Sequence, residues 1–385
     1  MKVNLHTHTT YCDGKNSVEE MIQDAIAAGF DVLGFSGHSY TSFDESYCMS
    51  REQTVQYAAE VRRLAEKYKE NIKVFCGIEQ DLFADDSAEG FDYAIGSVHA
   101  IFKECDAATL ASLKEAGAPP PPEGIVPVHE ADQAEPEKSP ARTGFYIYVD
   151  WDAAAMAWAI RWLYSCDSLG LAEDYFAHVA QVADMPGVQI VGHFDLLTKF
   201  NEQRLMAGRP PLFDTEDPRY QKAAFAAIQR ITASGRTHTP VGTGTLKDTG
   251  TLKCTGTHPG TGKIFEINTG AMSKGYRTTP YPSLPLLKEI RQAGGRIMIN
   301  SDCHAAGKLD WGYNLAAELA REAGFIHLTV PEIVPAAAPT AEPADAAAPT
   351  AEPAYATVPT AEPAAESAAG QTGGAYRLKW TEVKL

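Results

Sequence analysis

The chain has 385 residues, of which 44% are hydrophobic and 9% aromatic, values typical of a globular protein with an extensive core. Its 50 acidic and 33 basic side chains give a formal net charge of −17. This balance argues against nucleic acid as a partner, because phosphate contacts require Lys and Arg. No apolar run reaches the length of a membrane span, so a membrane partner is not expected either.

The cysteines indicate a reducing compartment. All 7 are scattered, and none forms the C-x-x-C pair of a zinc knuckle or a redox motif. The N-terminal residues are too polar for the apolar region of a signal peptide. We therefore expect a cytoplasmic location.

Strand-like runs alternate with helix-like runs along most of the chain, which is typical of a parallel α/β fold. Strands are predicted over residues 1–5, 31–37, 73–78, 93–98, 189–192, 264–267 and 296–300, with further runs at 145–149 and 326–330. Helices are predicted over residues 17–29, 51–68, 152–165, 171–183, 219–233, 285–293 and 312–323. The first helix opens with a capping box at Ser17 and stops at Gly29.

Three low-complexity segments interrupt this pattern. Residues 117–143 are rich in Pro, and residues 235–262 are rich in Gly and Thr, so both are predicted to be solvated insertions. Residues 331–375 repeat Pro-Thr-Ala-Glu-Pro-Ala, which offers nothing to build a core and predicts a linker. Residues 376–385 alternate again and are expected to return as a strand beside 326–330. We expect one domain spanning residues 1–385.

Potential metal ligands and other polar groups close the seven main predicted strands. His6 and His8 can face one point, because residues i and i+2 of an extended chain lie on the same side. In parallel barrels functional groups lie at the carboxyl ends of the strands. We therefore expect one site formed by His6, His8, Asp13, His38, Glu79, His99, His193, Asp302 and His304. The alternative is a set of satisfied core or turn residues, which should be scattered relative to the strands.

The remaining histidines serve as a comparison. Predicted non-ligands are those in low-complexity segments, in a helix or in the terminal strand, namely His129, His238, His258, His178 and His327. Nine ligands are too many for one tetrahedral ion and favour two or three divalent ions. Sites of imidazole and carboxylate accept zinc, iron or manganese, so the sequence leaves the metal open.

Several strings resemble one family. HTHTTYCDG at the N-terminus, GH at His38, GIEQD around Glu79, SVH at His99, GHFD at His193 and SDCH at Asp302 resemble motifs of the polymerase and histidinol phosphatase (PHP) superfamily. The strings GHFDLLTKFN and EINTGAMSKGYRTTPYPS resemble its histidinol-phosphatase branch. The resemblance implies a distorted (β/α)7 TIM-like barrel with a centre of three metal ions.

The resemblance also implies how the ligands are divided. One ion would take His6, His8, Glu79 and Asp302, and a second would take Glu79, His99 and His193, with Glu79 bridging. The third would take Asp13, His38 and His304. A metal-bound hydroxide would attack the phosphoryl group, and the residues placed in the catalytic step are Glu79, Asp302 and His304.

Substrate contacts are predicted around the ends of the fifth and sixth strands. Cationic side chains there favour phosphoryl oxygens, although surface charge is the alternative. Arg277 is the stronger candidate, ahead of Lys274 and Lys199. The organic part of the substrate is assigned to Tyr276, Phe194 and Asp195, although Asp195 could instead orient a metal ligand.

The leading hypothesis is a metal-dependent phosphatase that converts L-histidinol phosphate to L-histidinol and phosphate in histidine biosynthesis. One alternative is a PHP phosphoesterase acting on another small phosphomonoester, a nucleotide or a nucleic-acid end. Another is a non-catalytic metal-binding scaffold that recruits partners through its Pro-rich segment.

Overall fold

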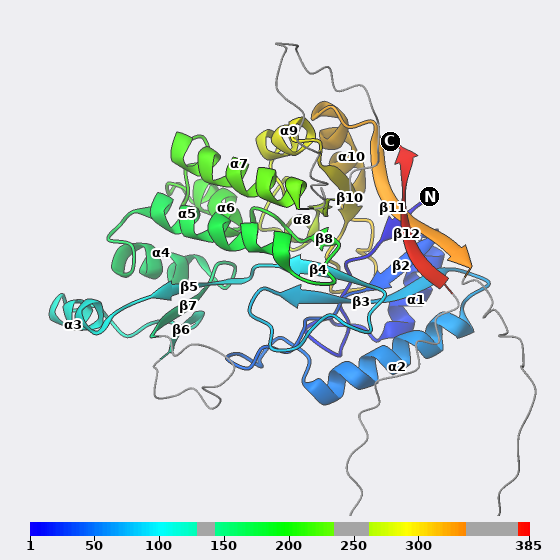
Figure 1. Cartoon of the computed structure of the whole chain (residues 1–385), viewed down its shortest axis with the longest axis horizontal. Helices are drawn as coiled ribbons and strands as arrows, with labels where there is room; N and C mark the ends of the chain where they lie inside the picture. The colour runs from blue at the N-terminus through cyan, green and yellow to red at the C-terminus, as the bar shows by residue number, and fades with distance from the viewer. Residues whose placement is uncertain (129–142, 235–261, 336–375) are drawn as a thin grey trace, which may run out of the picture. The chain divides into compact units, whose positions relative to one another are not determined.

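The structure is a computed structural model that describes residues 1–128, 143–234, 262–335 and 376–385 (Figure 1). The chain divides into two units, Met1–Val330 with Thr381–Leu385, and Pro331–Trp380. The predicted insertion at 235–262 and the predicted linker at 331–375 lie almost entirely outside the described residues, as does the second half of the segment 117–143.

A seven-stranded parallel sheet forms the core of the first unit. In spatial order its strands are β1 (Val3–Asn4), β2 (Val32–Phe35), β3 (Lys73–Asp81), β4 (Tyr93–Ser97), β8 (Ile190–Val191), β9 (Ile264–Asn268) and β10 (Arg296–Asn300). A parallel bridge between Thr7 and Cys303, just beyond β1 and β10, joins the two edges. The predicted TIM-like barrel of seven strands is therefore confirmed, and this bridge brings it close to closure.

Helices follow the strands and cover the barrel from outside (Figure 1). The longer ones are α1 (Val18–Ala27), α2 (Arg51–Lys67), α5 (Ser168–Val179), α7 (Pro218–Ala233), α9 (Leu284–Gln292) and α10 (Tyr313–Glu322). Each turns an apolar stripe inward, as α2 does with Tyr57, Val61 and Leu64. Strands β2, β4 and β9 are buried along their whole length, which explains their continuous apolar runs.

Tyr93 on β4 fills the barrel between β1, β2 and β3. Its hydroxyl oxygen lies 2.6 Å from the carbonyl oxygen of Leu5 and 2.9 Å from that of Phe35. An added Cβ would lie 2.3 Å from this hydroxyl at Gly34, and 2.3 Å from the Tyr93 ring at Gly77. Both glycines are therefore required by the close approach of Tyr93, which fixes the end of β1 just before His6.

A three-stranded antiparallel sheet follows β4 in the chain. Its order is β5 (Ala100–Glu104), β7 (Gly144–Tyr148) and β6 (Ile125–Val128), and in the chain α3 (Ala107–Glu115) follows β5 and α4 (Ala153–Trp162) follows β7. The sequence predicted β7 and α4 but neither β5, β6 nor α3. Ile125 is buried and pairs with Ile147, so the described start of the segment 117–143 belongs to this sheet.

The end of the chain returns to the barrel unit. β11 (His327–Pro335) and β12 (Tyr376–Lys384) form a two-stranded sheet. The backbone N–H of Leu385 donates to the carbonyl of Ile326 over 2.9 Å, and the His327 ring lies 3.5 Å from the Glu382 carboxylate.

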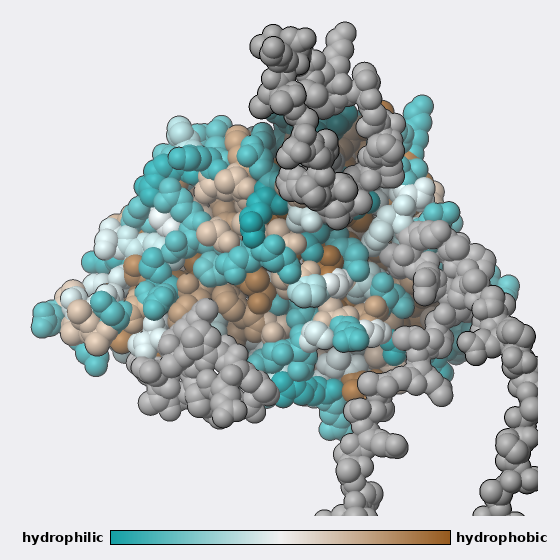
Figure 2. All heavy atoms as spheres, in the orientation of Figure 1, coloured by the Kyte–Doolittle hydropathy of each residue, from teal (hydrophilic) through white to brown (hydrophobic). Residues whose placement is uncertain are grey.

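Short helical turns complete the described chain: η2 (Ala180–Asp184), η3 (Leu196–Thr198), α6 (Asn201–Met206) and α8 (Gly270–Ser273). None of the described helices has both the length and the apolar character needed to cross a bilayer. Figure 2 shows hydrophilic residues interspersed with apolar ones over the face in view.

Candidate metal centre

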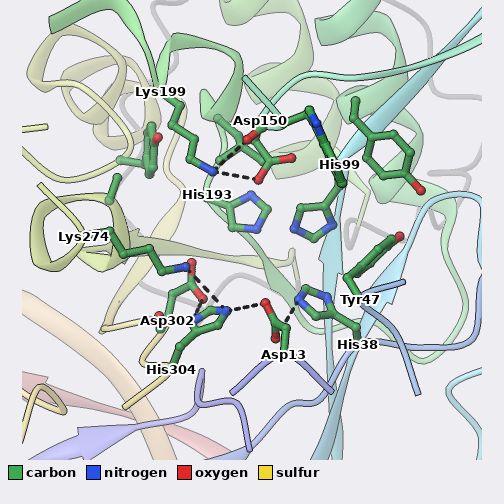
Figure 3. Close-up of a pocket in the computed structure, with 15 residues that line it drawn as sticks. Asp13, His38, Tyr47, His99, Asp150, His193, Lys199, Lys274, Asp302 and His304 are labelled. Atoms are coloured by element: carbon green, nitrogen blue, oxygen red, sulfur yellow. Dashed lines mark hydrogen bonds and ion pairs between the residues drawn. The ribbon is translucent and has the colours of Figure 1, made fainter. Parts of the chain in front are cut away.

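Buried imidazoles and carboxylates gather at the carboxyl ends of the barrel strands (Figure 3). The structure brings together all the residues predicted as ligands: His6, His8, Asp13, His38, Glu79, His99, His193, Asp302 and His304. They come from six different strand ends and from the loop after β1. This convergence follows from the parallel barrel, in which all strands end on the same side.

Glu79 lies at the centre of this group, with a side chain that is 1% exposed. Its two oxygens lie 3.0–3.5 Å from ring nitrogens of His6, His8, His38, His99 and His193. The Ser97 hydroxyl also donates to its Oε1 over 2.6 Å. Strand β3 continues to Asp81, so Glu79 lies inside the strand and not at its end as predicted. A carboxylate surrounded in this way can bridge two ions.

Three groups of donor atoms are compact enough to hold an ion, with the atoms of each group within 4.8 Å of one another. They are His8, Asp13, His38 and His304; His6, His8 and Asp302; and His38, Glu79 and His99. The first group contains Asp13, His38 and His304, which are all the residues predicted to bind the third ion. The other two contain parts of the remaining sets, and His193 reaches the centre through Glu79.

Several donor atoms of this group have no hydrogen-bond partner in the described part of the chain. The buried atoms are Nε2 of His6, Nε2 of His8, Nδ1 of His193 and Oε2 of Glu79. Buried polar atoms are normally paired, because leaving one unpaired costs about 1–3 kcal/mol. Imidazole and carboxylate donors are also the ligands that first-row divalent metals take. The residues therefore fit a divalent metal centre.

The charges of the centre shift the pKa values of its members in opposite directions. Burial alone would raise the pKa of Glu79, but the surrounding His6, His38 and His99 lower it well below the ordinary range. Burial lowers the pKa of His38 to about 3. For His99, burial is outweighed by Glu79 and Asp81, and its pKa rises to about 10. The metal-free centre thus holds ionised carboxylates beside both neutral and protonated imidazoles.

Two further carboxylates orient the ligands, and the sequence did not single them out. Glu266 on β9 accepts a 2.9 Å hydrogen bond from Nδ1 of His6 and a 2.7 Å bond from the backbone N–H of His193. Asp81 accepts one of 3.0 Å from Nδ1 of His99. Because a carboxylate only accepts, each of the His6 and His99 rings has a hydrogen on Nδ1, which leaves Nε2 as the atom available to bind metal. For Glu266, the sequence signal was an ionisable residue inside a mostly apolar strand, β9.

A cavity of about 350 Å³ opens over the candidate ligands. Two lysines and an aspartate reach into it (Figure 3). Lys199 Nζ lies 3.1 Å from Oδ2 of Asp150, and Lys274 Nζ lies 3.5 Å from Nε2 of His304. Aromatic side chains line the remaining wall, namely Tyr47, Tyr148, Trp151 and Tyr281.

Of the five predicted substrate contacts, only Lys274 lines this cavity. Arg277 and Asp195 are buried and line a second, separate pocket, where Arg277 packs against the outer side of Tyr281. Phe194 packs in the core against Phe176 and Phe265, because alternate residues after β8 point to opposite sides.

Tyr276, the last of these five, packs against Phe200. The weaker candidate Lys199 does line the cavity. Of the histidines predicted as non-ligands, His178 and His327 take no part in the three donor groups. His129, His238 and His258 lie outside the described residues.

Comparisons with known proteins agree with this arrangement. Residues 4–116 match the family model of the PHP domain. The protein named "Probable histidinol-phosphatase" in Schizosaccharomyces pombe is 22% identical over 357 residues, which cover 86% of this chain and 90% of that protein. The DNA polymerase/3'-5' exonuclease PolX of Bacillus subtilis is 27% identical over 124 residues, which cover 30% of this chain and 21% of that protein.

Two solved structures share the fold. One, from Listeria monocytogenes and assigned as a histidinol phosphatase, has a TM-score of 0.54 at 16% identity and covers 82% of this chain and 99% of its own. The other is the histidinol phosphate phosphatase of Lactococcus lactis with zinc, L-histidinol and phosphate, with a TM-score of 0.51 at 16% identity over 85% of this chain and 95% of its own. The resemblance to the PHP superfamily is therefore confirmed, as a PHP domain over residues 4–116 and as a shared barrel beyond it.

Proposed function

We propose that this protein is a metal-dependent phosphatase that hydrolyses L-histidinol phosphate to L-histidinol and phosphate. The observation that carries the proposal is the cavity itself, whose floor is a set of metal-ligand side chains and whose walls carry cations and aromatic rings. Proteins that match this chain along nearly their whole length, one in sequence and two in fold, are named for this activity.

We infer that the centre holds two or three divalent ions, because nine donor residues in three compact groups exceed what one ion takes. When bound, such ions supply an activated water and neutralise charge on the phosphoryl oxygens. The chain supplies the geometry: Glu79 joins the groups, and Glu266 and Asp81 hold the His6 and His99 rings in the tautomer that can bind metal.

The phosphoryl group is assigned to the space between the ligand cluster and the two lysines. Lys274 stands beside His304, and Lys199 stands beside Asp150 (Figure 3). Burial lowers the pKa of Lys199, but the neighbouring Asp150 raises it above its ordinary value, so the side chain stays charged. Fixed cations in a partly buried cavity stabilise phosphoryl charge more strongly than they do in water.

The organic part of the substrate is assigned to Asp150 and the aromatic wall. L-Histidinol phosphate carries an ammonium group and an imidazole ring. The Asp150 carboxylate offers an acceptor for the ammonium group. Burial would raise the pKa of Asp150, but the nearby Lys199 lowers it below its ordinary value, so the carboxylate stays ionised. Tyr47 and Tyr148, whose ring centroids lie 5.9 Å apart, offer faces for a planar ring.

A second candidate is hydrolysis of a nucleotide phosphoester. The match to the PolX exonuclease supports it, although that match covers only 21% of PolX. The cavity gives little support for a nucleic-acid strand, because its lining includes Asp13, Asp150 and Asp302 beside two lysines and the whole chain has a net charge of −17.

The test is a steady-state assay of the metal-loaded protein on L-histidinol phosphate, p-nitrophenyl phosphate and a mononucleotide. We expect kcat/KM to be highest for L-histidinol phosphate by roughly tenfold or more, in proportion to a few polar contacts. Asp150→Asn should reduce that preference while retaining turnover of p-nitrophenyl phosphate, which has no ammonium group. Equal rates on all three esters would contradict the substrate assignment, and preference for the nucleotide would favour the second candidate.

A further inference from the structure

A second pocket of about 220 Å³ lies behind the turn that carries Lys199. It is built by η3, α6, the chain after α6 and the segment around Arg277. The side chains that define its chemistry are Asp195, Thr198, Glu202, Leu205, Asp214 and Arg277. None of the mechanistic roles given above uses this pocket.

The lining has an excess of negative charge. Three carboxylates, of Asp195, Glu202 and Asp214, face one guanidinium, of Arg277, among the lining residues. That guanidinium is partly engaged: its Nη1 donates to Thr198 Oγ1 over 2.5 Å, whereas its Nε has no hydrogen-bond partner among the described residues and lies 3.8 Å from Glu202 Oε1. With three carboxylates against one guanidinium, the lining favours a cation.

One carboxylate oxygen in this pocket has no donor in the described structure. Asp195 is fully buried, and its Oδ2 accepts a 3.2 Å hydrogen bond from the backbone N–H of Ser283. Its Oδ1 has no hydrogen-bond partner. This oxygen is therefore a buried acceptor that lacks a donor, a state that costs free energy. A ligand that donates a hydrogen bond and carries positive charge would complete it.

The rest of the lining suits a carbon chain. Leu205, Pro211 and Phe213 give the pocket an apolar side, and Leu205 stands at its mouth with 56% of its surface exposed. The volume is below the 300–1,000 Å³ that is typical of drug-sized ligands, so the occupant is small. We propose that this pocket is a second binding site for a small organic ammonium ion, with the charged nitrogen on Asp195 and the carbon body against Leu205 and Phe213.

The site shares a wall with the catalytic cavity. Along one short segment the residues alternate between the two, with Asp195 and Thr198 lining the second pocket and Leu196 and Lys199 lining the first. Arg277 likewise packs 4.2 Å from the ring of Tyr281, which lines the catalytic cavity. An ammonium ion on Asp195 therefore biases the position of Lys199, and by reciprocity a ligand at Lys199 changes the affinity of the second pocket.

Binding of n-butylammonium chloride, the probe, is measured by saturation-transfer NMR on the full-length, metal-loaded protein. The neutral 1-butanol is the matched control ligand. Leu205→Lys places a positive charge at the mouth, whereas Met206→Lys puts the same charge on a neighbouring residue that is 70% exposed and outside the lining. We expect Leu205→Lys to weaken n-butylammonium binding by about tenfold, roughly the effect of one lost ionic contact, and Met206→Lys to leave it unchanged.

A second variant, Asp195→Asn, should remove the preference for n-butylammonium over 1-butanol. The proposal is overturned if Leu205→Lys and Met206→Lys bind the amine equally well, or if 1-butanol binds as tightly as the amine. It is also overturned if Asp150→Asn alone abolishes binding, because the amine then occupies the catalytic cavity. An absence of binding would mean that water alone satisfies Asp195, which overturns it as well.

The shared wall is tested by turnover of p-nitrophenyl phosphate with and without saturating n-butylammonium. We expect the amine to change KM or kcat by about twofold or more in the native protein and in Met206→Lys, but not in Leu205→Lys. A response that is identical in all three proteins would contradict the coupling between the two pockets. Because the binding experiment needs no turnover, its outcome is independent of the proposed phosphatase activity.

Discussion

Glu79 is the residue on which the centre most depends, because its two oxygens meet five imidazoles. Glu79→Gln replaces a bridging acceptor by an amide that has one acceptor and one donor face. We expect the metal content per chain to fall and turnover to drop by roughly 100-fold or more, because more than one ion loses a ligand. Elemental analysis and initial rates test this, with the exposed Glu89→Gln as the matched control. Unchanged metal content in Glu79→Gln would rule out the bridging role.

Glu266 acts through the ligands and not on the substrate. Its carboxylate accepts hydrogen bonds from four buried groups: His6 Nδ1, the His193 backbone, Asn268 and Asn300. In Glu266→Gln one of these donors would meet an N–H, so we expect metal affinity to fall by about 10–100-fold while the barrel still folds. Competition titration with a chelating dye measures the affinity. If only turnover changed and affinity did not, Glu266 would have another role.

The raised pKa of His99 predicts how the metal-free protein responds to pH. Burial would lower the pKa of His99, but Glu79 and Asp81 raise it by more, so the pKa rises from 6.5 to about 10 on folding. The stabilisation from this group is therefore fully present below pH 6.5 and is lost as pH rises to about 10. Urea midpoints of chelator-treated protein should fall across this range, and fall less steeply in His99→Gln. The same slope in both proteins would contradict the assignment.

The candidate ligands could be grouped from sequence because each lies in or just after the last part of a recognisable strand, and strand ends converge in a parallel barrel. Substrate contacts could not be predicted in the same way. Arg277 is near the site in sequence, but the loop after β9 turns its guanidinium to the far side of Tyr281. Asp150 was missed because it follows β7, which belongs to the antiparallel sheet and not to the barrel.

Among the elements, β1 is held by Tyr93, which packs so closely that no Cβ fits at Gly34 of β2 or Gly77 of β3. Gly34→Ala would bring a Cβ within 2.3 Å of the Tyr93 hydroxyl. We expect it to destabilise the protein by about 1–3 kcal/mol, the usual cost of overpacking. Tyr93→Phe removes the hydroxyl, so the double variant should lose less free energy of unfolding than the two single variants lose together. Thermal unfolding of the four proteins forms the cycle, and strict additivity would argue against this contact.

The elements that the sequence missed share a physical feature. Strands β5 and β6 are short, pair with β7 from positions far apart in the chain, and in β6 include a proline. Local periodicity carries little information about such pairing, since it depends on tertiary contacts. The barrel strands were easier to predict because burial on both faces gives each a continuous apolar run.

At the scale of the whole molecule, every candidate ligand lies between His6 and His304, in the first unit. The segment 336–375 is composed mainly of Pro, Ala, Thr and Glu. We expect a chain in which a short Gly/Ser linker replaces residues 336–375 to keep its metal content and its turnover, because β11 and β12 are retained. Loss of both properties in a folded protein would show that this segment contributes to the site.

The most direct test of the proposed chemistry is the rate at which phosphate is released from L-histidinol phosphate by the purified protein, before chelation, after chelation, and after a divalent metal is restored. We expect turnover that is lost with the metal and returns with it, because candidate metal ligands form the floor of the cavity. An absence of phosphate release from the metal-loaded protein, or a rate unaffected by removing the metal, would contradict a metal-dependent histidinol-phosphate phosphatase.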